Sequence, residues 1–149
     1  MKEKTGKERE LPMALRAAYM ALHRNTDAAF AAHGVTADQF VLLLALRDGH
    51  ALTQRELADR ISSDSSTVRA MLVLLEKRGL VRRDRHATDS RAKTVSLTTA
   101  GKQKRRKLWK AGQEIRDAMH GALTTADAEV LVGLLQRVAC ALNREKLLA

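Results

Sequence analysis

The chain has 149 residues, of which 45% are hydrophobic and 30% are charged. That length supports one ordinary hydrophobic core and is too short for two independent domains, so we expect a single domain over residues 1–149. Lysine and arginine number 27 against 17 for aspartate and glutamate, which gives a formal net charge of +10. Such an excess is high for a soluble protein without a polyanionic partner, and it favours a protein that binds nucleic acid.

The same sequence disfavours membrane proteins, disulfide-linked proteins and enzymes. No apolar run approaches the ~18 residues that a membrane span needs, and the N-terminus lacks the apolar core of a signal peptide. The single cysteine, Cys140, excludes an intramolecular disulfide and a cysteine-rich zinc site. The histidines are scattered, and there is no Gly-rich phosphate loop and no nucleophile beside a base. We therefore expect a cytoplasmic protein with no membrane partner, no metal, no cofactor and no enzymatic activity.

Helical patterns dominate the N-terminal part of the chain. Residues 1–10 are nearly all polar and mixed in charge, which predicts a frayed lead-in. Pro12 fits the first turn of a helix that we expect within residues 11–34. Thr36 and Gln39 then form a capping box, which starts a further helix. That helix is apolar around much of its circumference and is therefore expected to be buried.

Two short helices joined by a tight turn are predicted between Thr53 and Gly79. Thr53 and Glu56 form a second capping box at the start of the first helix. The polar run at residues 62–64 ends this helix and caps the next one, because such side chains hydrogen-bond to local backbone. Gly79 supplies a left-handed stop. This is the outline of a helix-turn-helix.

The start of the second helix carries short polar side chains and one long donor, namely Ser65, Ser66, Thr67 and Arg69. Short side chains let the backbone approach DNA closely, and hydroxyl groups bond to phosphates or base edges. Arg69 is the best candidate for a bidentate contact to guanine, worth ~1–3 kcal/mol of discrimination. A solvated helix end is the competing interpretation. The adjacent turn and the net charge favour contact with DNA.

After Gly79 the pattern changes to the period of two that is typical of strands. Residues 80–84 and 93–97 are short β-prone segments around a polar loop, which predicts a hairpin with a long tip. The basic residues of this region are Lys77, Arg78, Arg82, Arg83, Arg85, Arg91 and Lys93, against Asp84 and Asp89. A basic tip beside a recognition helix can reach the minor groove. For Arg91 the alternative is a pair with Asp89 that shapes the loop, and both can hold.

In the joint spacing of these motifs the chain resembles the winged helix-turn-helix of the MarR family of bacterial transcriptional regulators. The matching runs are residues 52–58, 66–68, 75–81, 89–93 and 96–101. The resemblance implies a mainly α fold with a small β-hairpin wing. It implies a DNA-binding lobe over residues 36–97 and dimerisation helices over residues 11–34 and 98–148. One departure is Ser62, where many helix-turn-helix turns place glycine.

Carried over by position, the resemblance implies that Ser65, Ser66, Thr67 and Arg69 contact the major groove of DNA and that Arg91 contacts the minor groove. The further candidate DNA-binding residues are Thr53, Gln54, Arg85 and Lys93.

The pattern of the C-terminal third predicts two helices whose apolar surface needs a partner to pack on. Thr98 and Thr99 open a long helix that ends at Gly121, and its basic residues between positions 102 and 110 indicate a solvated face with general attraction to DNA. Thr124 caps a last helix with an apolar stripe. Because a compact lobe cannot hide the apolar stripes of both terminal regions, we expect a helical homodimer. A two-fold dimer presents its recognition helices ~34–36 Å apart and reads a pseudo-palindromic site in double-stranded DNA.

The sequence therefore predicts a dimeric, sequence-specific transcriptional regulator, most simply a repressor. The family resemblance implies release from the operator by a small, often phenolic or aromatic, anionic ligand. His23 and Trp109 are candidates for lining its pocket, although such residues on helices more often serve packing. Two alternatives stay open, a non-specific architectural DNA-binding protein and a redox-responsive regulator acting through Cys140. For Cys140 a buried, inert thiol is the favoured interpretation.

Overall fold

The computed structural model describes residues 2–89, 91 and 93–148. The chain divides into two compact units, residues 1–112 and residues 113–149. The first unit contains α1 (Lys2–Phe30), the 3-10 helix η1 (Ala31–His33), α2 (Ala37–Ala45), β1 (Leu52–Thr53), α3 (Gln54–Arg60), α4 (Ser65–Lys77), β2 (Val81–Arg85), β3 (Lys93–Leu97) and α5 (Thr99–Ala111). The second unit contains α6 (Gln113–Gly121) and α7 (Thr125–Leu148). Ser90 and Ala92, which belong to the predicted wing tip, lie outside the described residues.

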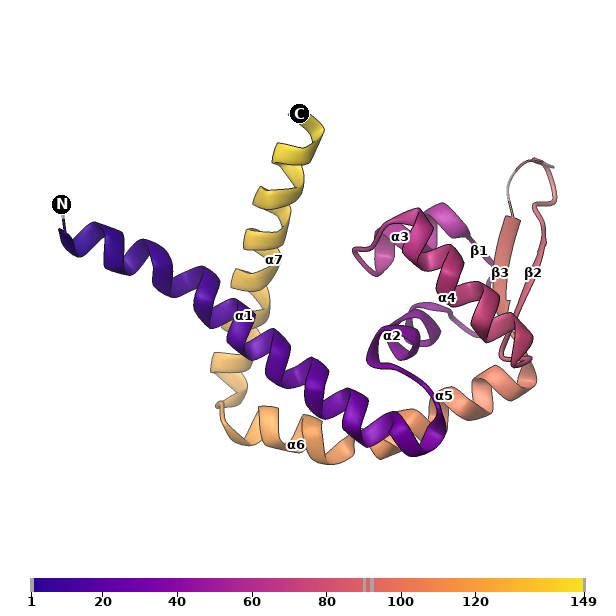
Figure 1. Ribbon diagram of the computed structural model, residues 1–149, viewed down its shortest axis with the longest axis horizontal. Coiled ribbons are helices and arrows are strands. Elements are labelled where there is room, and N and C mark those ends of the chain that lie inside the picture. The colour runs from indigo at the N-terminus through magenta and orange to yellow at the C-terminus, as the bar shows by residue number, and fades with distance from the viewer. Residues whose placement is uncertain (1, 90, 92, 149) are drawn as a thin grey trace. The chain divides into compact units, whose positions relative to one another are not determined.

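The predicted fold class, mainly α with a small β wing, is confirmed. Figure 1 shows α3 and α4 beside the hairpin of β2 and β3. The sheet has a third strand that the sequence did not predict, because β1 pairs antiparallel with β3 and gives the order β1-β3-β2. Leu52 lies opposite Val95 in this pairing. A two-residue strand has no periodicity of its own, so only its partner defines it.

Both predicted capping boxes are present. At the start of α2 the backbone N–H of Gln39 donates to the Thr36 hydroxyl at 3.1 Å, and the backbone N–H of Thr36 donates to the Gln39 side chain at 3.1 Å. Thr53 and Glu56 repeat this reciprocal arrangement at the start of α3, also at 3.1 Å. Each box satisfies helix N–H groups that have no partner inside the helix. The helix starts were therefore predictable from local hydrogen bonding alone.

Two helix boundaries differ from the predictions. Helix α1 begins at Lys2, so Pro12 lies inside it rather than in its first turn, and the frayed lead-in was wrong. Lysine and glutamate are good helix formers, so the polarity of this segment indicated exposure and not absence of structure. The single long helix expected up to Gly121 is broken at Gly112, which ends α5. Glycine is a poor helix former, and here it donates its N–H to the carbonyl of Leu108 at 3.0 Å.

The core of the first unit joins α2, α3, α4, the sheet and α5. Its fully buried large side chains are Phe30, Leu42, Leu43, Leu46, Leu57, Leu72, Leu75, Leu108, Val68 and Val95. Phe30 and Phe40 meet edge to face with their ring centroids 4.8 Å apart. The expectation that α2 is buried holds for only part of its surface, since Val41 and Leu44 are 44% and 41% exposed. The core positions α3 and α4 as one rigid pair.

Arginine side chains tie the ends of helices to distant parts of the first unit. The guanidinium of Arg78 donates to the carbonyls of Gly34 and His33, the latter at 3.2 Å. Arg105 donates to the carbonyl of Leu46 at the end of α2 and pairs with Asp48. Carbonyls at a helix C-terminus lack partners within the helix and favour nearby cations. Arg105 therefore corrects the prediction of a wholly solvated basic face, because its side chain is only 19% exposed.

The second unit has no core of its own within its described residues. No described residue of α6 or α7 is buried. The large apolar side chains that these helices and their connection leave exposed are Met119, Leu123, Val130, Leu131, Val132, Leu134, Leu135 and Leu142. Within the described residues no single helix is long and apolar enough to cross a bilayer, although Gly6–His33 and Ala37–Ala45, a pair bent by 85°, together meet those two criteria.

Candidate nucleic-acid interface

The turn between α3 and α4 is built by local hydrogen bonds. Asp64 caps α4 by accepting the backbone N–H of Thr67 at 2.8 Å and the Thr67 hydroxyl at 2.7 Å. These bonds, the backbone one first, lower the pKa of the Asp64 carboxyl from its usual value. Ser62 has a φ of 54°, the left-handed conformation that glycine adopts most readily. The turn therefore forms in spite of the departure from glycine that the sequence shows.

Helix α4 separates its packing face from its exposed face. Val68, Leu72 and Leu75 are buried against the rest of the unit. The four predicted major-groove residues are exposed, namely Ser65, Ser66, Thr67 and Arg69. The Thr67 hydroxyl donates its hydrogen to Asp64, so this side chain offers other groups chiefly an acceptor and an apolar methyl group.

A basic depression of about 400 Å³ lies between α3, α4 and the wing. It is lined by Thr53, Gln54, Arg55, Ser65, Arg69, Arg83, Arg91 and Lys93. The fold thus brings most of the predicted DNA-binding residues together, while Ser66, Thr67 and Arg85 are exposed outside this lining. Arg55 and Arg83 were not predicted as site residues. Arg55 follows Gln54 in the first turn of α3, and its adjacency to two predicted residues was the signal that could have identified it.

Arg83 has a structural role that orients the wing. Its guanidinium pairs with Glu76 of α4 through Nη2 to Oε1 at 3.0 Å and Nε to Oε2 at 3.2 Å. The backbone N–H of Arg83 donates to the same carboxylate at 3.2 Å. Hydrogen bonding to Arg83 lowers the pKa of the Glu76 carboxyl. The pair locks β2 to α4, and it leaves Arg55, Arg69, Arg91 and Lys93 to set the positive charge of the depression.

At the wing tip the side chain of Asp89 contacts the backbone of Arg91. The backbone N–H of Arg91 donates to Oδ1 of Asp89 at 3.0 Å, so Asp89 contacts the loop backbone. This bond does not use the guanidinium of Arg91, which lines the basic depression. Loop shaping and presentation of the arginine to DNA are therefore compatible.

Comparison with known proteins agrees with this geometry. A family model described as MarR family matches residues 35–93. The transcriptional regulator HosA of Escherichia coli O157:H7 is 29% identical over 104 residues, which are 70% of this chain and 77% of HosA. MarR of E. coli in complex with operator DNA is 26% identical with a TM-score of 0.79, over 89% of this chain and 95% of that one. Over residues 35–93, which hold the helix-turn-helix and the two strands of the wing, the chain therefore matches the MarR family.

A further structural neighbour is BpsR of Bordetella bronchiseptica, whose DNA binding is regulated by 6-hydroxynicotinic acid. It is 27% identical to this MarR-family chain with a TM-score of 0.79, over 88% of this chain and 94% of BpsR. Because MarR-family proteins are transcriptional regulators, the prediction of a regulator rather than an enzyme is confirmed.

The two candidate ligand-pocket residues of this MarR-family protein have other surroundings. His23 pairs through Nδ1 with Asp27 at 3.3 Å and through Nε2 with Asp38 at 3.5 Å, and its ring lies 5.7 Å from that of Tyr19. Trp109 lies on α5 and is 49% exposed. Neither residue lines the basic depression. His23 therefore links α1 to the start of α2, which is the packing role that the sequence gave as the alternative.

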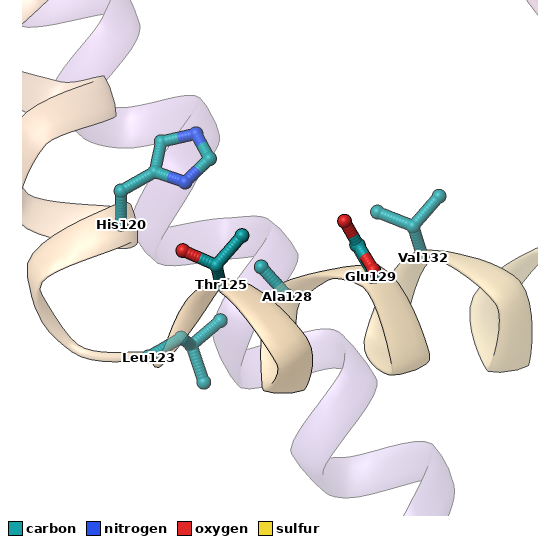
Figure 2. Close-up of a pocket in the computed structure, with 6 residues that line it drawn as sticks. All are labelled: His120, Leu123, Thr125, Ala128, Glu129 and Val132. Atoms are coloured by element: carbon teal, nitrogen blue, oxygen red, sulfur yellow. The ribbon is translucent and has the colours of Figure 1, made fainter.

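The second unit has an open hollow of about 420 Å³, which the sequence did not predict. Its lining comes from the end of α6, the connection and the first turns of α7, as Figure 2 shows. Figure 2 shows His120 and Leu123 before α7, and Glu129 and Val132 along it. Cys140, further along α7, is exposed in this chain, so the expectation of a buried thiol was wrong. Cys140 lies on α7, where no described residue is buried, and this explains the difference.

Proposed function

We propose that this MarR-family protein is a homodimer that binds a pseudo-palindromic operator in double-stranded DNA. The start of α4, from Ser65 to Arg69, occupies the major groove, and the wing carries Arg91 into the neighbouring minor groove. The observation that supports this most directly is the basic depression between α3, α4 and the wing, where Arg55, Arg69 and Arg91 gather beside short polar side chains. Cations that contact phosphates fix the position of the protein on the duplex, and the long arginine donors read base edges.

The dimer is supported by the apolar surface of the second unit. Two helices with no buried residue among those described cannot offset their own ordering entropy, so they need a partner surface. A second copy of the chain would supply it with two-fold symmetry. Two recognition helices ~34–36 Å apart would then reach successive major grooves. The contact regions would be residues 11–34 and 98–148, with the DNA-binding lobe over residues 36–97.

We further propose that the protein acts in the cytoplasm as a repressor and leaves its operator when a small anionic ligand binds. BpsR, regulated by a hydroxylated aromatic acid, supports this class of ligand. Such a ligand acts only if it binds more tightly to a spacing of the recognition helices that mismatches the operator. A coupling free energy of ~1–3 kcal/mol would lower operator affinity ~5–150-fold.

Arg69→Ala tests the proposed base contact. We expect operator affinity to fall by ~1–3 kcal/mol with relaxed preference at one base pair, because a bidentate arginine contact discriminates between bases. The measurement is fluorescence anisotropy with an inverted repeat from upstream of the gene and with scrambled DNA at one salt concentration. Arg106→Ala, an exposed arginine on α5, is the matched control and should weaken both DNAs alike. An equal loss on both DNAs for Arg69→Ala would contradict the assignment.

The same titration separates the alternatives. A non-specific architectural protein would bind the inverted repeat and the scrambled duplex with nearly equal affinity. A redox-responsive regulator is the second candidate, because the thiol of Cys140 is exposed. It would lose operator binding after treatment with a hydroperoxide, and the variant Cys140→Ser would not.

A further inference from the structure

His86 makes an unusual set of contacts at the start of the wing tip. It follows directly after β2 and is half-buried. Its Nδ1 lies 3.2 Å from the backbone nitrogens of Thr88 and Asp89, and 3.2 Å from the Thr88 hydroxyl. A backbone N–H can only donate a hydrogen bond. These two contacts require Nδ1 to accept, which is the arrangement of an imidazole whose proton is on Nε2.

These bonds continue toward the arginine of the wing. Asp89, whose backbone N–H is held by His86, accepts the backbone N–H of Arg91 through Oδ1 at 3.0 Å. The ladder between β2 and β3 ends at the pair Arg85–Lys93. Beyond that pair, in the described part of the tip, the links from His86 and Asp89 take over from strand pairing. Two hydrogen bonds thus connect His86, through Asp89, to the backbone of Arg91.

Protonation would reverse the role of this nitrogen. An imidazole that gains a second proton donates from both nitrogens, and Nδ1 would then face two backbone donors. Histidine is the side chain whose charge ordinarily changes between about pH 5 and 8. The neighbouring charges are those of Arg85, Lys93, Arg91 and Asp89, while Asp84 is paired with Arg82 at 2.9 Å. Added positive charge alone would strengthen attraction to DNA. A less ordered tip would weaken DNA binding, so the two effects of protonation on DNA affinity oppose each other.

We propose that His86 is a positioning residue for the wing, and that its protonation releases the tip and weakens operator binding. The neutral imidazole holds the backbone of Thr88 and Asp89, and through Asp89 it sets where Arg91 is presented. The protonated imidazole cannot accept these bonds, so the minor-groove contact becomes less ordered. The proposal rests on the DNA-binding function proposed above. It adds that protonation of His86 regulates that same DNA-binding surface.

Two variants separate the effect of losing the hydrogen-bond acceptor at residue 86 from the effect of gaining a positive charge there. His86→Asn places Oδ1 as many bonds from Cβ as Nδ1 and accepts hydrogen bonds at every pH. His86→Ala removes the acceptor at every pH. Operator affinity is measured between pH 8 and pH 5.5 at constant ionic strength. The wild type should lose about 2- to 10-fold in affinity relative to His86→Asn as the pH falls, and His86→Ala should already show that loss at pH 8.

The other histidines are the same in all three proteins, so the ratio between wild type and His86→Asn isolates residue 86. In an Arg91→Ala background this ratio should stay constant with pH, because the tip acts through Arg91. Parallel pH profiles for wild type and His86→Asn, or tighter binding of the wild type at pH 5.5, would overturn the proposal.

A measurement without DNA keeps this test independent of the proposed function. In NMR spectra of the free protein, the amide signals of Thr88 and Asp89 should titrate together with the His86 ring in the wild type. They should stay unchanged over that range in His86→Asn. Failure of every variant to bind the operator would refute the proposed function. Amide signals that ignore the titration of His86 would refute the positioning role.

Discussion

Single side chains at the ends of helices connect much of this protein. Arg78 binds carbonyls at the end of η1, Arg105 binds the last carbonyl of α2, and Arg83 binds Glu76. Arg78 and Arg105 bind carbonyls that have no partner within their helices, and Arg83 pairs with a carboxylate. These arginines account for part of the positive charge. We assign to DNA the arginines of the basic depression for which the described residues provide no such anchor, namely Arg55, Arg69 and Arg91.

The cap at Asp64 leads to a prediction about pH. The pKa of its carboxyl is lowered from the ordinary 3.8 by bonds from Thr67, so the ionised form is bound better in the folded state. This stabilisation is present above pH 3.8 and is lost as the pH falls through the lower, folded-state value. We expect Asp64→Asn to have a lower Tm than wild type at pH 6, with the difference shrinking toward pH 3. Thermal unfolding followed by circular dichroism measures this, and a difference constant with pH would contradict it.

Between elements, the start of α5 closely approaches the residues just before β2 of the wing. The Thr98 hydroxyl donates to the carbonyl of Gly79 at 2.6 Å and accepts the N–H of Gly101 at 3.0 Å. A Cβ on Gly101 would lie 1.9 Å from the carbonyl oxygen of Leu80, a backbone atom that cannot move aside independently. The absence of a side chain at Gly101 therefore lets α5 begin directly beside the wing and carry it on the core.

Gly101→Ala should destabilise the protein by ~1–3 kcal/mol, because the added methyl group forces backbone apart. Denaturant unfolding of the wild type and the variant measures the change in free energy of unfolding. Gly6→Ala is the control, since no atom lies within 4 Å of its Cβ position in α1. The control should leave stability unchanged or raise it by up to about 1 kcal/mol, since alanine is the better helix former. Equal effects of the two substitutions would show that the contact with Leu80 is unimportant.

For the whole molecule, the exposed apolar surface of α7 is the feature that demands a partner. Leu131 and Leu135 lie one helical turn apart and are 42% and 40% exposed. Burying such side chains contributes ~25 cal/mol per Å² of apolar area, which favours association through this stripe. Association would also place two recognition helices on one DNA duplex.

The double variant Leu131→Asp, Leu135→Asp should be monomeric, because charges in an apolar interface are left desolvated and unpaired. It should also bind the operator more weakly, since one lobe alone contacts a single half-site. Sedimentation velocity and anisotropy measure the two effects. Gln136→Asp, an exposed polar position on the same helix, should leave the dimer intact. A double variant that still sediments as a dimer would move the interface elsewhere.

Much of the fold was predictable because its signals are local. The capping boxes at Thr36 and Thr53, and the cap at Asp64, use partners three residues away, so the sequence shows both sides of each bond. The exposed side chains at the start of α4 follow from helical period alone. The glycine stop at Gly79 is likewise local, with a φ of 70°. The helix-turn-helix and the exposure of the side chains at the start of α4 could therefore be predicted without coordinates.

Only the tertiary structure decided which distant groups meet. The pairing of β1 with β3, the bond from Arg105 to Leu46, 59 residues apart, and the contact of Gly101 with Leu80 have no periodic signal. Arg83 and Arg91 look alike in the sequence, yet packing pairs Arg83 with Glu76. The sequence by itself determined most of the elements and the caps at Thr36, Thr53 and Asp64, because hydrogen bonds within a few residues fix them. Packing determined which cations bind within the protein and which remain for DNA, because that choice depends on partners far away along the chain.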